Sequence, residues 1–293
     1  MLGEIRGEVR FKEPLSFHTS LRIGGPADIF IVPQDVEDIR LALSFAEREQ
    51  LSLDVIGGGN NLLVSDRGVR GVVLKLEGCL GRAEFNGEEA VAGAGVSLSA
   101  LIREAAALNL GGIECLVGVP ATVGGAVAMN AGTHDGGIAD FISAVYFLYP
   151  DGTLGEFKPG NGSYSYDVFT PPAKSVLIGA RLQLHRRPFA EIQKDIKQRL
   201  KQKKSTQPLA LASVGCVWKN PPGETATRLI EKVGLKGKRL NGAEISAKHA
   251  NFIVNRGGAA ASDIKALMQL TLDRVRNHFG ITLEAEMKTM GEI

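Results

Sequence analysis

Three consecutive glycines that follow a short apolar strand limit the possible structures of this chain more than any other feature. Residues 53–56 (Leu-Asp-Val-Ile) have the composition of a strand, and a loop starts directly after them. The loop consists of Gly57, Gly58, Gly59, Asn60 and Asn61. Glycines allow successive backbone N–H groups to surround an anion, and amide side chains add neutral donors. The loop is not the Rossmann fingerprint, because Leu62 stands where that motif has its third glycine. It therefore indicates either a phosphate site or a glycine-rich turn between two strands.

A second glycine-rich segment lies at residues 118–132. Its small side chains allow a flat ring system or a pyrophosphate to approach the backbone at Gly118, Gly124 and Gly125. The alternative is a packed turn between core elements. Two such loops in one half of the chain favour one extended ligand, and a dinucleotide has that shape. The composition does not decide between a flavin and a nicotinamide nucleotide.

The charges and the cysteines restrict the class of protein. The chain has 34 basic and 32 acidic residues, a net charge of +2, which argues against nucleic acid as the main partner. Its three cysteines form no CxxC pair and, being odd in number, no disulfide framework. It has neither a signal peptide nor an apolar run of membrane-spanning length, so we expect a cytoplasmic protein without membrane contact. No metal-ligand spacing is present, and we expect no metal and no obligate protein partner.

Strand and helix patterns alternate irregularly, which predicts an α+β fold. In the first part we expect strands at residues 28–32, 53–56, 72–76, 142–149 and 176–184 and helices at residues 35–49 and 98–108. A strongly charged helix at residues 188–204 indicates a bridge to a second domain. In that domain we expect a helix at residues 224–233, a strand at residues 251–255, and a helix at residues 263–279 with Ser262 as its N-cap and Gly280 after its end. The predicted domains are residues 17–187 and 188–293.

Six segments, taken together, resemble one protein family. They are residues 15–28, 57–66, 118–132, 213–223, 245–255 and 283–291, in the order in which that family has them. The chain resembles the MurB family of UDP-N-acetylenolpyruvoylglucosamine reductases from about residue 15 to residue 291, in the family's compact subtype. The resemblance implies an FAD-binding domain of the vanillyl-oxidase (PCMH) type, with lobes at about residues 1–75 and 76–187, and a smaller C-terminal α+β substrate domain.

The resemblance also implies the reaction. NADPH reduces FAD, and the flavin then reduces UDP-N-acetylglucosamine enolpyruvate to UDP-N-acetylmuramate, a step of peptidoglycan synthesis and hence of cell-wall biogenesis, cell shape and cell division. The resemblance implies that the residues named above in the two glycine segments bind the cofactor. The partner is a UDP-sugar.

Two residues match the catalytic positions of the family. Cys216 stands where most members have the Ser that protonates carbon, and a thiol, with a pKa of about 8.5, can donate that proton. The alternative is a small buried cysteine. Glu286 matches the family's C-terminal carboxyl group, which stays protonated if its pKa is raised. The alternative is a solvated Glu on a final strand, and such a strand would place Glu284 on the same face.

One expected residue is absent. The family has an Arg after a Tyr, and here Ser165 or Asp167 stands in its place, depending on the register. We expect Lys219 or Lys248 to supply the missing positive charge. The candidate substrate-binding residues are Tyr166, Lys219, Asn220, Lys248 and His249. For the Tyr the alternative is core packing, and for His249 it is a structural role.

Three functions are therefore open from the sequence. The first is the enolpyruvyl reductase. The second is a related FAD-dependent oxidase or dehydrogenase with another substrate, which the missing Arg favours. The third is a non-catalytic flavin or nucleotide-sugar binder, against which the retained Cys216 and Glu286 argue.

Overall fold

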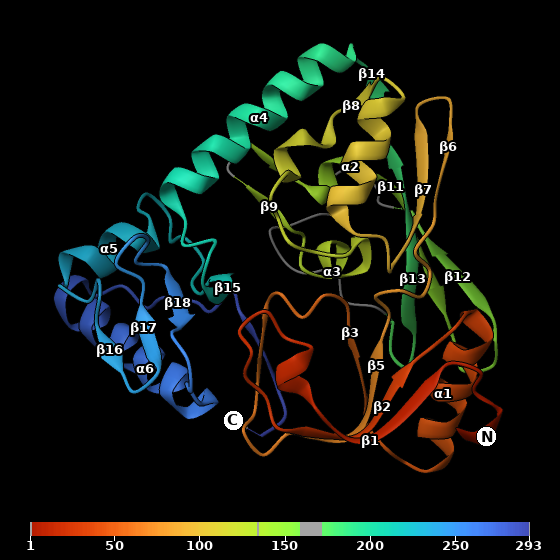
Figure 1. Ribbon diagram of the computed structural model, residues 1–293, viewed down its shortest axis with the longest axis horizontal. Helices are drawn as coiled ribbons and strands as arrows, with labels where there is room; N and C mark the ends of the chain where they lie inside the picture. The colour runs from red at the N-terminus through yellow and green to blue at the C-terminus, as the bar shows by residue number, and fades with distance from the viewer. Residues whose placement is uncertain (1, 134, 159–171, 293) are drawn as a thin grey trace. The chain divides into compact units, whose positions relative to one another are not determined.

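A computed structural model describes residues 2–133, 135–158 and 172–292 of the chain. These residues form two compact units, and each unit combines stretches that are distant in sequence (Figure 1). Unit 1 comprises Met1–Phe11, Ile29–Gly58 and Gly71–Gln202, and unit 2 comprises Lys12–Asp28, Gly59–Arg70 and Lys203–Ile293. The domain boundary that the sequence predicts between residues 187 and 188 stays a prediction.

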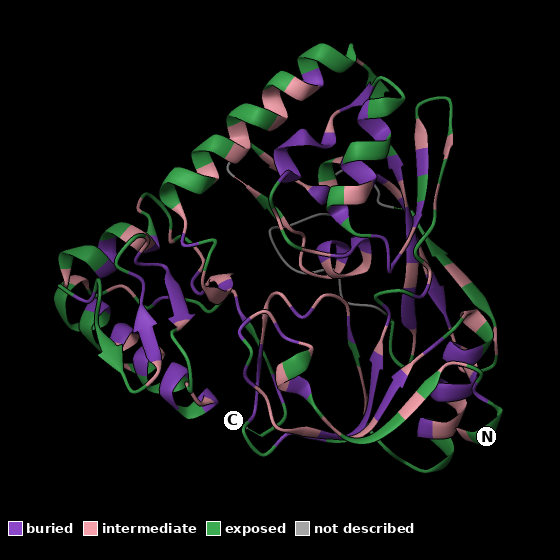
Figure 2. Ribbon diagram, in the orientation of Figure 1, coloured by how far each residue is buried: buried purple, intermediate pink, exposed green. Residues whose placement is uncertain are grey.

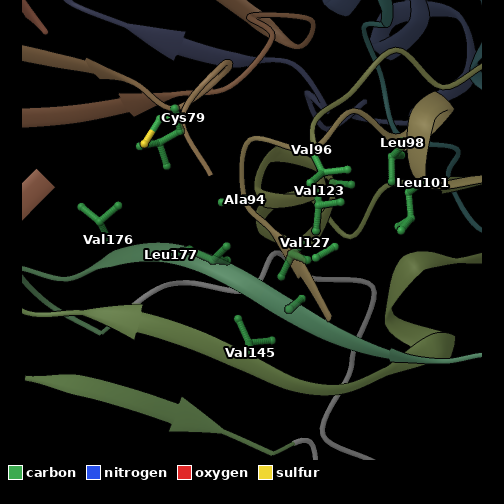
Figure 3. Packing of buried hydrophobic residues seen from close by; sticks show 14 of the residues in the cluster. Cys79, Ala94, Val96, Leu98, Leu101, Val123, Val127, Val145, Val176 and Leu177 are labelled. Atoms are coloured by element: carbon green, nitrogen blue, oxygen red, sulfur yellow. The ribbon is translucent and has the colours of Figure 1, made fainter. Parts of the chain in front are cut away.

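Unit 1 is built around an antiparallel sheet of five strands in the order β12-β11-β13-β7-β6. The strands are β6 (Ala83–Asn86), β7 (Glu89–Gly93), β11 (Ile142–Leu148), β12 (Leu154–Phe157) and β13 (Val176–Gln183). The helix α3 (Val123–Ala128) packs against β7 and β13. Figure 3 shows how Val123 and Val127 of α3, with Leu98 and Leu101 of the helix α2 (Leu98–Ala107), join a buried cluster that also contains Val145 of the sheet.

A second sheet has the order β1-β2-β5-β3, and its strands β3 and β5 run parallel. Its strands are β1 (Glu8–Pro14), β2 (Pro26–Val32), β3 (Leu53–Ile56) and β5 (Val69–Lys75). The helix α1 (Val36–Arg48) buries Ile39 and Ala42 in the same core as Val72 and Leu74 of β5. Its N-cap is Asp35, whose carboxylate accepts the backbone N–H groups of Glu37 and Asp38, as an aspartate before an apolar helix should.

The helix α4 (Phe189–Thr206) confirms the charged helix that the sequence predicts at residues 188–204. Ile192 is its only fully buried residue among those described, and Figure 2 shows that most of the helix is exposed or intermediate. Such a thin apolar stripe is typical of a helix that packs along only one narrow line. Across all described residues, none of the helices is both long and apolar enough to pass through a bilayer.

Unit 2 contains a small antiparallel sheet in the order β15-β18-β17-β16. Its strands are β15 (Ala212–Cys216), β16 (Arg239–Leu240), β17 (Ala243–Ile245) and β18 (Phe252–Asn255). The helices α5 (Ala226–Lys232) and α6 (Ala261–Phe279) contribute Ile230 and Leu267 to a core that includes Trp218. These elements confirm the helices and the strand that the sequence predicts for this region, with shifts of up to two residues at their ends.

The predicted N-cap of the long helix is wrong. Helix α6 begins at Ala261, so Ser262 lies inside its first turn. The cap comes from a distant residue, because the carboxylate of Asp66 accepts the backbone N–H groups of Ala261 at 2.8 Å and Ser262 at 3.2 Å. Asp263 adds a bond from the N–H of Ala260 at 2.9 Å. The C-terminal end is as predicted, since Gly280 has the left-handed φ of 70° that ends many helices.

The last strand of the chain pairs with a segment that follows the three glycines. Strand β19 (Lys288–Met290) runs parallel to β4 (Leu62–Val64) within unit 2. The remaining short elements are η1 (Leu2–Glu4), η2 (Leu15–Phe17), β8 (Leu110–Gly111), η3 (Ile113–Leu116), β9 (Gly132–Thr133), β10 (Gly136–Gly137), η4 (Ile138–Phe141) and β14 (His185–Arg186).

Candidate active site

The two glycine segments touch each other within unit 1. Gly57 follows β3, and a Cβ atom at this position would lie 2.3 Å from Oγ1 of Thr122, far inside van der Waals contact. Thr122 is the N-cap of α3, and its Oγ1 accepts the N–H of Gly125 at 3.3 Å. Gly124 is equally restricted, because a Cβ there would lie 2.8 Å from the Cβ of Ala94. Glycine is therefore required at Gly57 and Gly124 by the close approach of neighbouring atoms.

The glycine loop offers backbone donors. Among the described residues, none accepts a hydrogen bond from the backbone N–H of Gly57, Gly58 or Gly59. Gly59 also has a φ of 63°, a left-handed conformation that favours glycine. Consecutive N–H groups without an internal acceptor suit an anionic group such as a pyrophosphate. The loop therefore fits a dinucleotide cofactor.

In unit 2, Cys216 and Glu286 are held on neighbouring backbone segments. Cys216 pairs with Phe252 at the end of β15, and the N–H of Glu286 donates to the carbonyl of Val217 at 2.8 Å. An isolated bridge between Trp218 and Ala285 continues this pairing. The structure thus brings together the two residues that the sequence selects as catalytic.

The surroundings of this pair raise the pKa of both groups. Burial raises the pKa of the Cys216 thiol to about 12, the charge of Glu286 adds to the effect, and Lys203 opposes it. Burial also raises the pKa of Glu286, against the opposing charge of Lys219. A raised pKa favours the protonated form of each group, and a protonated thiol or carboxyl group is suited to donate its proton.

The two glutamates near the C-terminus have different environments. The side chain of Glu284 is 72% exposed and its Oε1 lies 2.5 Å from Nζ of Lys219. Glu286 is half-buried. Neither glutamate lies in the final strand, because β19 begins only at Lys288, and between them Ala285 forms a single bridge with Trp218.

The candidate substrate-binding residues of unit 2 already have partners in the chain. Oδ1 of Asn220 accepts the N–H of Ala226 at 3.0 Å, and Nζ of Lys248 donates to the carbonyl of Lys204 at 2.5 Å. The ring of His249 packs edge-on against Phe252, with 4.7 Å between the centroids.

His249 also has an unusual environment. Its Nδ1 is buried without a hydrogen-bond partner among the described residues. Burial lowers the pKa of this His, so its ring is neutral at neutral pH. Tyr166 lies outside the described residues, as do Ser165 and Asp167, where the family's Arg is expected.

Comparison with known proteins identifies the family of the chain. The family described as "UDP-N-acetylenolpyruvoylglucosamine reductase, C-terminal domain" matches residues 207–290, and the family "FAD binding domain" matches residues 27–158. UDP-N-acetylenolpyruvoylglucosamine reductase 2 of Symbiobacterium thermophilum is 40% identical over 287 residues, which are 97% of this chain and 93% of the relative. The chain belongs to the UDP-N-acetylenolpyruvoylglucosamine reductase (MurB) family.

Other members of the MurB family are similar over the same length. The reductase of Anaeromyxobacter sp. is 42% identical over 288 residues, which are 98% of this chain and 90% of the relative. The crystal structure of MurB from Thermus caldophilus superposes with a TM-score of 0.82 at 35% identity and covers 98% of this chain and 99% of that one. The fold is thus an FAD-binding PCMH-type domain with a MurB C-terminal domain, as the resemblance implies.

Sequence reasoning missed three residues that organise this MurB site. Thr122 lies between Gly57 and Gly125, and Asn251 holds the backbone of Trp218. Ser20 bonds to two carbonyls, that of Gly59 through its N–H and that of Ser213 through its hydroxyl. The Oγ of Ser20 donates to the carbonyl of Ser213 at 2.7 Å. Thr122 could have been found, because a Thr before a Gly-Ala run is a capping signal.

Proposed function

We infer that this chain is an FAD-dependent reductase that converts UDP-N-acetylglucosamine enolpyruvate to UDP-N-acetylmuramate with NADPH. The reaction belongs to peptidoglycan precursor synthesis. The observation that carries this conclusion is the similarity over nearly the whole length to MurB reductases, combined with the placement of Cys216 beside Glu286.

The residues of the two glycine segments bind the cofactor in this proposal. Gly57, Gly58 and Gly59 present their N–H groups to the pyrophosphate of FAD, and Asn60 and Asn61 lie directly after them. Gly118, Gly124 and Gly125 leave room for the cofactor beside α3. Bound FAD supplies hydride transfer from NADPH to the terminal carbon of the enolpyruvyl group.

The residues of unit 2 supply the proton. The thiol of Cys216 donates a proton to the carbon next to the one that receives the hydride, and the resulting thiolate takes a proton from solvent before the next turnover. Hydride and proton together saturate the double bond, and NADPH is the species oxidised. The protonated carboxyl group of Glu286 donates a hydrogen bond to the substrate carboxylate, where negative charge develops. The raised pKa values of both groups support these roles.

Positively charged and polar groups near this pair bind the substrate. We assign the diphosphate and the carboxylate to Lys219, Asn220 and Lys248, with His249 and Tyr166 beside them. When substrate binds, Lys219 releases Glu284 and contacts the substrate instead. This is feasible because Glu284 is exposed, and an exposed ion pair contributes little free energy. The two lysines also supply the charge that the absent Arg would bring.

The remaining assignments follow from the chemistry of the chain. We propose that the enzyme works in the cytoplasm, because its cysteines Cys79, Cys115 and Cys216 are all free thiols. We further propose that residues 17–187 and 188–293 are its domains and that it needs no protein partner.

Stopped-flow spectroscopy of the FAD-loaded protein separates this function from the alternatives. NADPH should bleach the flavin absorbance, and the enolpyruvyl sugar nucleotide should restore it without oxygen. Cys216→Ala should spare the bleaching and slow the restoration. Restoration by oxygen but not by the sugar nucleotide would instead support the oxidase. The absence of the family's Arg at Ser165 or Asp167 favours that alternative. No bleaching by any donor would support a binding protein.

A further inference from the structure

We propose that Asn251 is a positioning residue that fixes Cys216 for proton transfer. This inference rests on the acid role proposed above for Cys216. Asn251 precedes β18, and its side chain does not belong to the catalytic pair or to the candidate substrate contacts.

The side chain of Asn251 bonds to both backbone groups of one residue. Its Oδ1 accepts the N–H of Trp218 at 2.9 Å, and its Nδ2 donates to the carbonyl of Trp218 at 2.8 Å. The backbone carbonyl of Asn251 accepts the N–H of Val217 at 2.9 Å. Because a primary amide offers the same donor and acceptor as a peptide group, this side chain acts as an additional strand residue beside Trp218.

The backbone needs this support because the sheet is irregular here. Strand β15 pairs with β18 at Ser213 and again at Cys216, but the register shifts between the two. Gly215 within this interval has a φ of 83°, a left-handed conformation that is typical of a bulge and interrupts the regular strand. Regular pairing therefore holds Cys216 only through Phe252. Beyond it, Asn251 holds the next two residues, because its backbone carbonyl accepts the N–H of Val217 and its side chain bonds to both backbone groups of Trp218.

Because these groups are buried, the hydrogen bonds between Asn251 and Trp218 are hard to replace. Asn251 is 2% exposed and Trp218 is 3% exposed, so water has little access to replace a lost bond. Removal of the amide leaves the N–H and the carbonyl of Trp218 without their partner, and the segment 216–218 must shift to satisfy them. Proton donation to carbon depends on distance, and a displacement of about 1 Å can cost about 100-fold in rate.

The test compares two asparagines, one directly before β18 and one at its end, in the two half-reactions. Asn251→Ala and the isosteric Asn251→Asp are measured beside Asn255→Ala as a matched control. Asn255 is the last residue of β18, and its side chain likewise bonds to backbone groups: the carbonyl of Leu21 and the N–H groups of Gly257 and Ala259. We expect about a 10- to 100-fold slower re-oxidation by the enolpyruvyl sugar nucleotide for both Asn251 variants, with unchanged bleaching by NADPH. The Asn255 variant should keep both rates.

A second comparison shows whether Asn251 acts through the thiol. In a Cys216→Ala background, Asn251→Ala should have no further effect on re-oxidation, because the group that it positions is absent. Equal slowing of re-oxidation by Asn251→Ala with and without Cys216 would overturn the proposal. So would equal slowing of bleaching and re-oxidation, or re-oxidation that is unchanged in the Asn251 variants. If Cys216→Ala alone leaves re-oxidation unchanged, it is the acid role of Cys216 that fails. If Asn251→Ala does not retain FAD, Asn251→Asp decides the same comparison because it keeps the side-chain volume.

Discussion

The side-chain amide of Asn61 donates a hydrogen bond to the backbone carbonyl of Glu286, with 3.2 Å between nitrogen and oxygen. The backbone carbonyl of Asn61 in turn accepts the N–H of Lys288 at 3.1 Å. Both contacts lie within unit 2. They join the end of the glycine loop to the segment that carries the proposed carboxyl donor, so a residue chosen for cofactor binding also holds Glu286 in place.

The two neighbouring asparagines should therefore respond differently to truncation. Among the described residues, none forms a hydrogen bond with the side chain of Asn60. We expect Asn60→Ala to weaken FAD binding only, with a normal rate once FAD is saturating. Asn61→Ala should stay slow in re-oxidation at saturating FAD, because its bond to Glu286 is lost. Flavin titration followed by stopped-flow measures both quantities, and identical behaviour of the two variants would contradict the assignment.

A single methyl group at Gly57 should disturb the cofactor site. The Cβ of Gly57→Ala would lie 2.3 Å from Oγ1 of Thr122. Overpacking of this kind costs about 1–3 kcal/mol, so we expect FAD affinity to fall by about 10- to 100-fold. Removal of the opposing atom in Gly57→Ala with Thr122→Ala should restore part of the affinity, because the next Thr122 atoms lie at 3.5 Å.

Gly81→Ala is the control for that pair of variants, because its Cβ would meet only the carbonyl of Gly78 at 3.7 Å. Its FAD affinity should be that of the unmodified protein. A Gly57→Ala protein that binds FAD normally would show that the loop tolerates the contact.

The reactivity of Cys216 should report the charge of Glu286. Burial and the Glu286 carboxylate raise the pKa of the thiol to about 12, so Glu286→Gln removes a negative charge and should lower that pKa. The thiolate fraction at a fixed alkaline pH then rises, and alkylation by iodoacetamide should become faster. Mass spectrometry of the Cys216 peptide measures this rate.

The Cys79 peptide is the internal reference for this experiment. Burial raises the pKa of Cys79 to about 11, and the charges that act on it are those of Asp35 and Asp38. Its alkylation should not change with Glu286→Gln. Slower or unchanged alkylation of Cys216 would mean that Glu286 does not act on the thiol.

The distant cap of α6 should matter for stability, and the serine expected from the sequence should not. Asp66→Ala removes the acceptor of two backbone N–H groups and should lower the free energy of unfolding by about 0.5–2 kcal/mol. Ser262→Ala should stay within about 0.5 kcal/mol of the unmodified protein. Trp218 is the single Trp and lies in the core of unit 2, so its fluorescence during urea unfolding follows this unit. A larger loss of unfolding free energy for Ser262→Ala than for Asp66→Ala would show that Ser262, and not Asp66, caps α6.

Local signals predicted the regular elements well. Asp35 and Ser97 mark the starts of α1 and α2 because each side chain bonds to N–H groups two or three residues ahead. The helix α3 was missed, since its sequence Val-Gly-Gly-Ala-Val-Ala has no helical periodicity of large apolar residues. It forms because Thr122 caps it and the sheet packs against it.

Long-range contacts explain what the sequence could not show. Asp66 caps a helix that starts 195 residues later, and Asn251 bonds to a residue 33 positions earlier. No local pattern encodes such pairs, because each residue type suits many loops equally well. The proximity of Cys216 and Glu286 could be expected only through the family resemblance, which supplies the tertiary information that a single sequence lacks.

The parallel pair of β4 and β19 has a consequence for biosynthesis. Residues 62–64 gain their strand partner only when residues 288–290 have left the ribosome. Contacts of such large sequence separation form late and slowly. The nascent chain therefore carries an unpaired β4 beside its glycine loop until residues 288–290 emerge, and flavin cannot enter a finished site before that point.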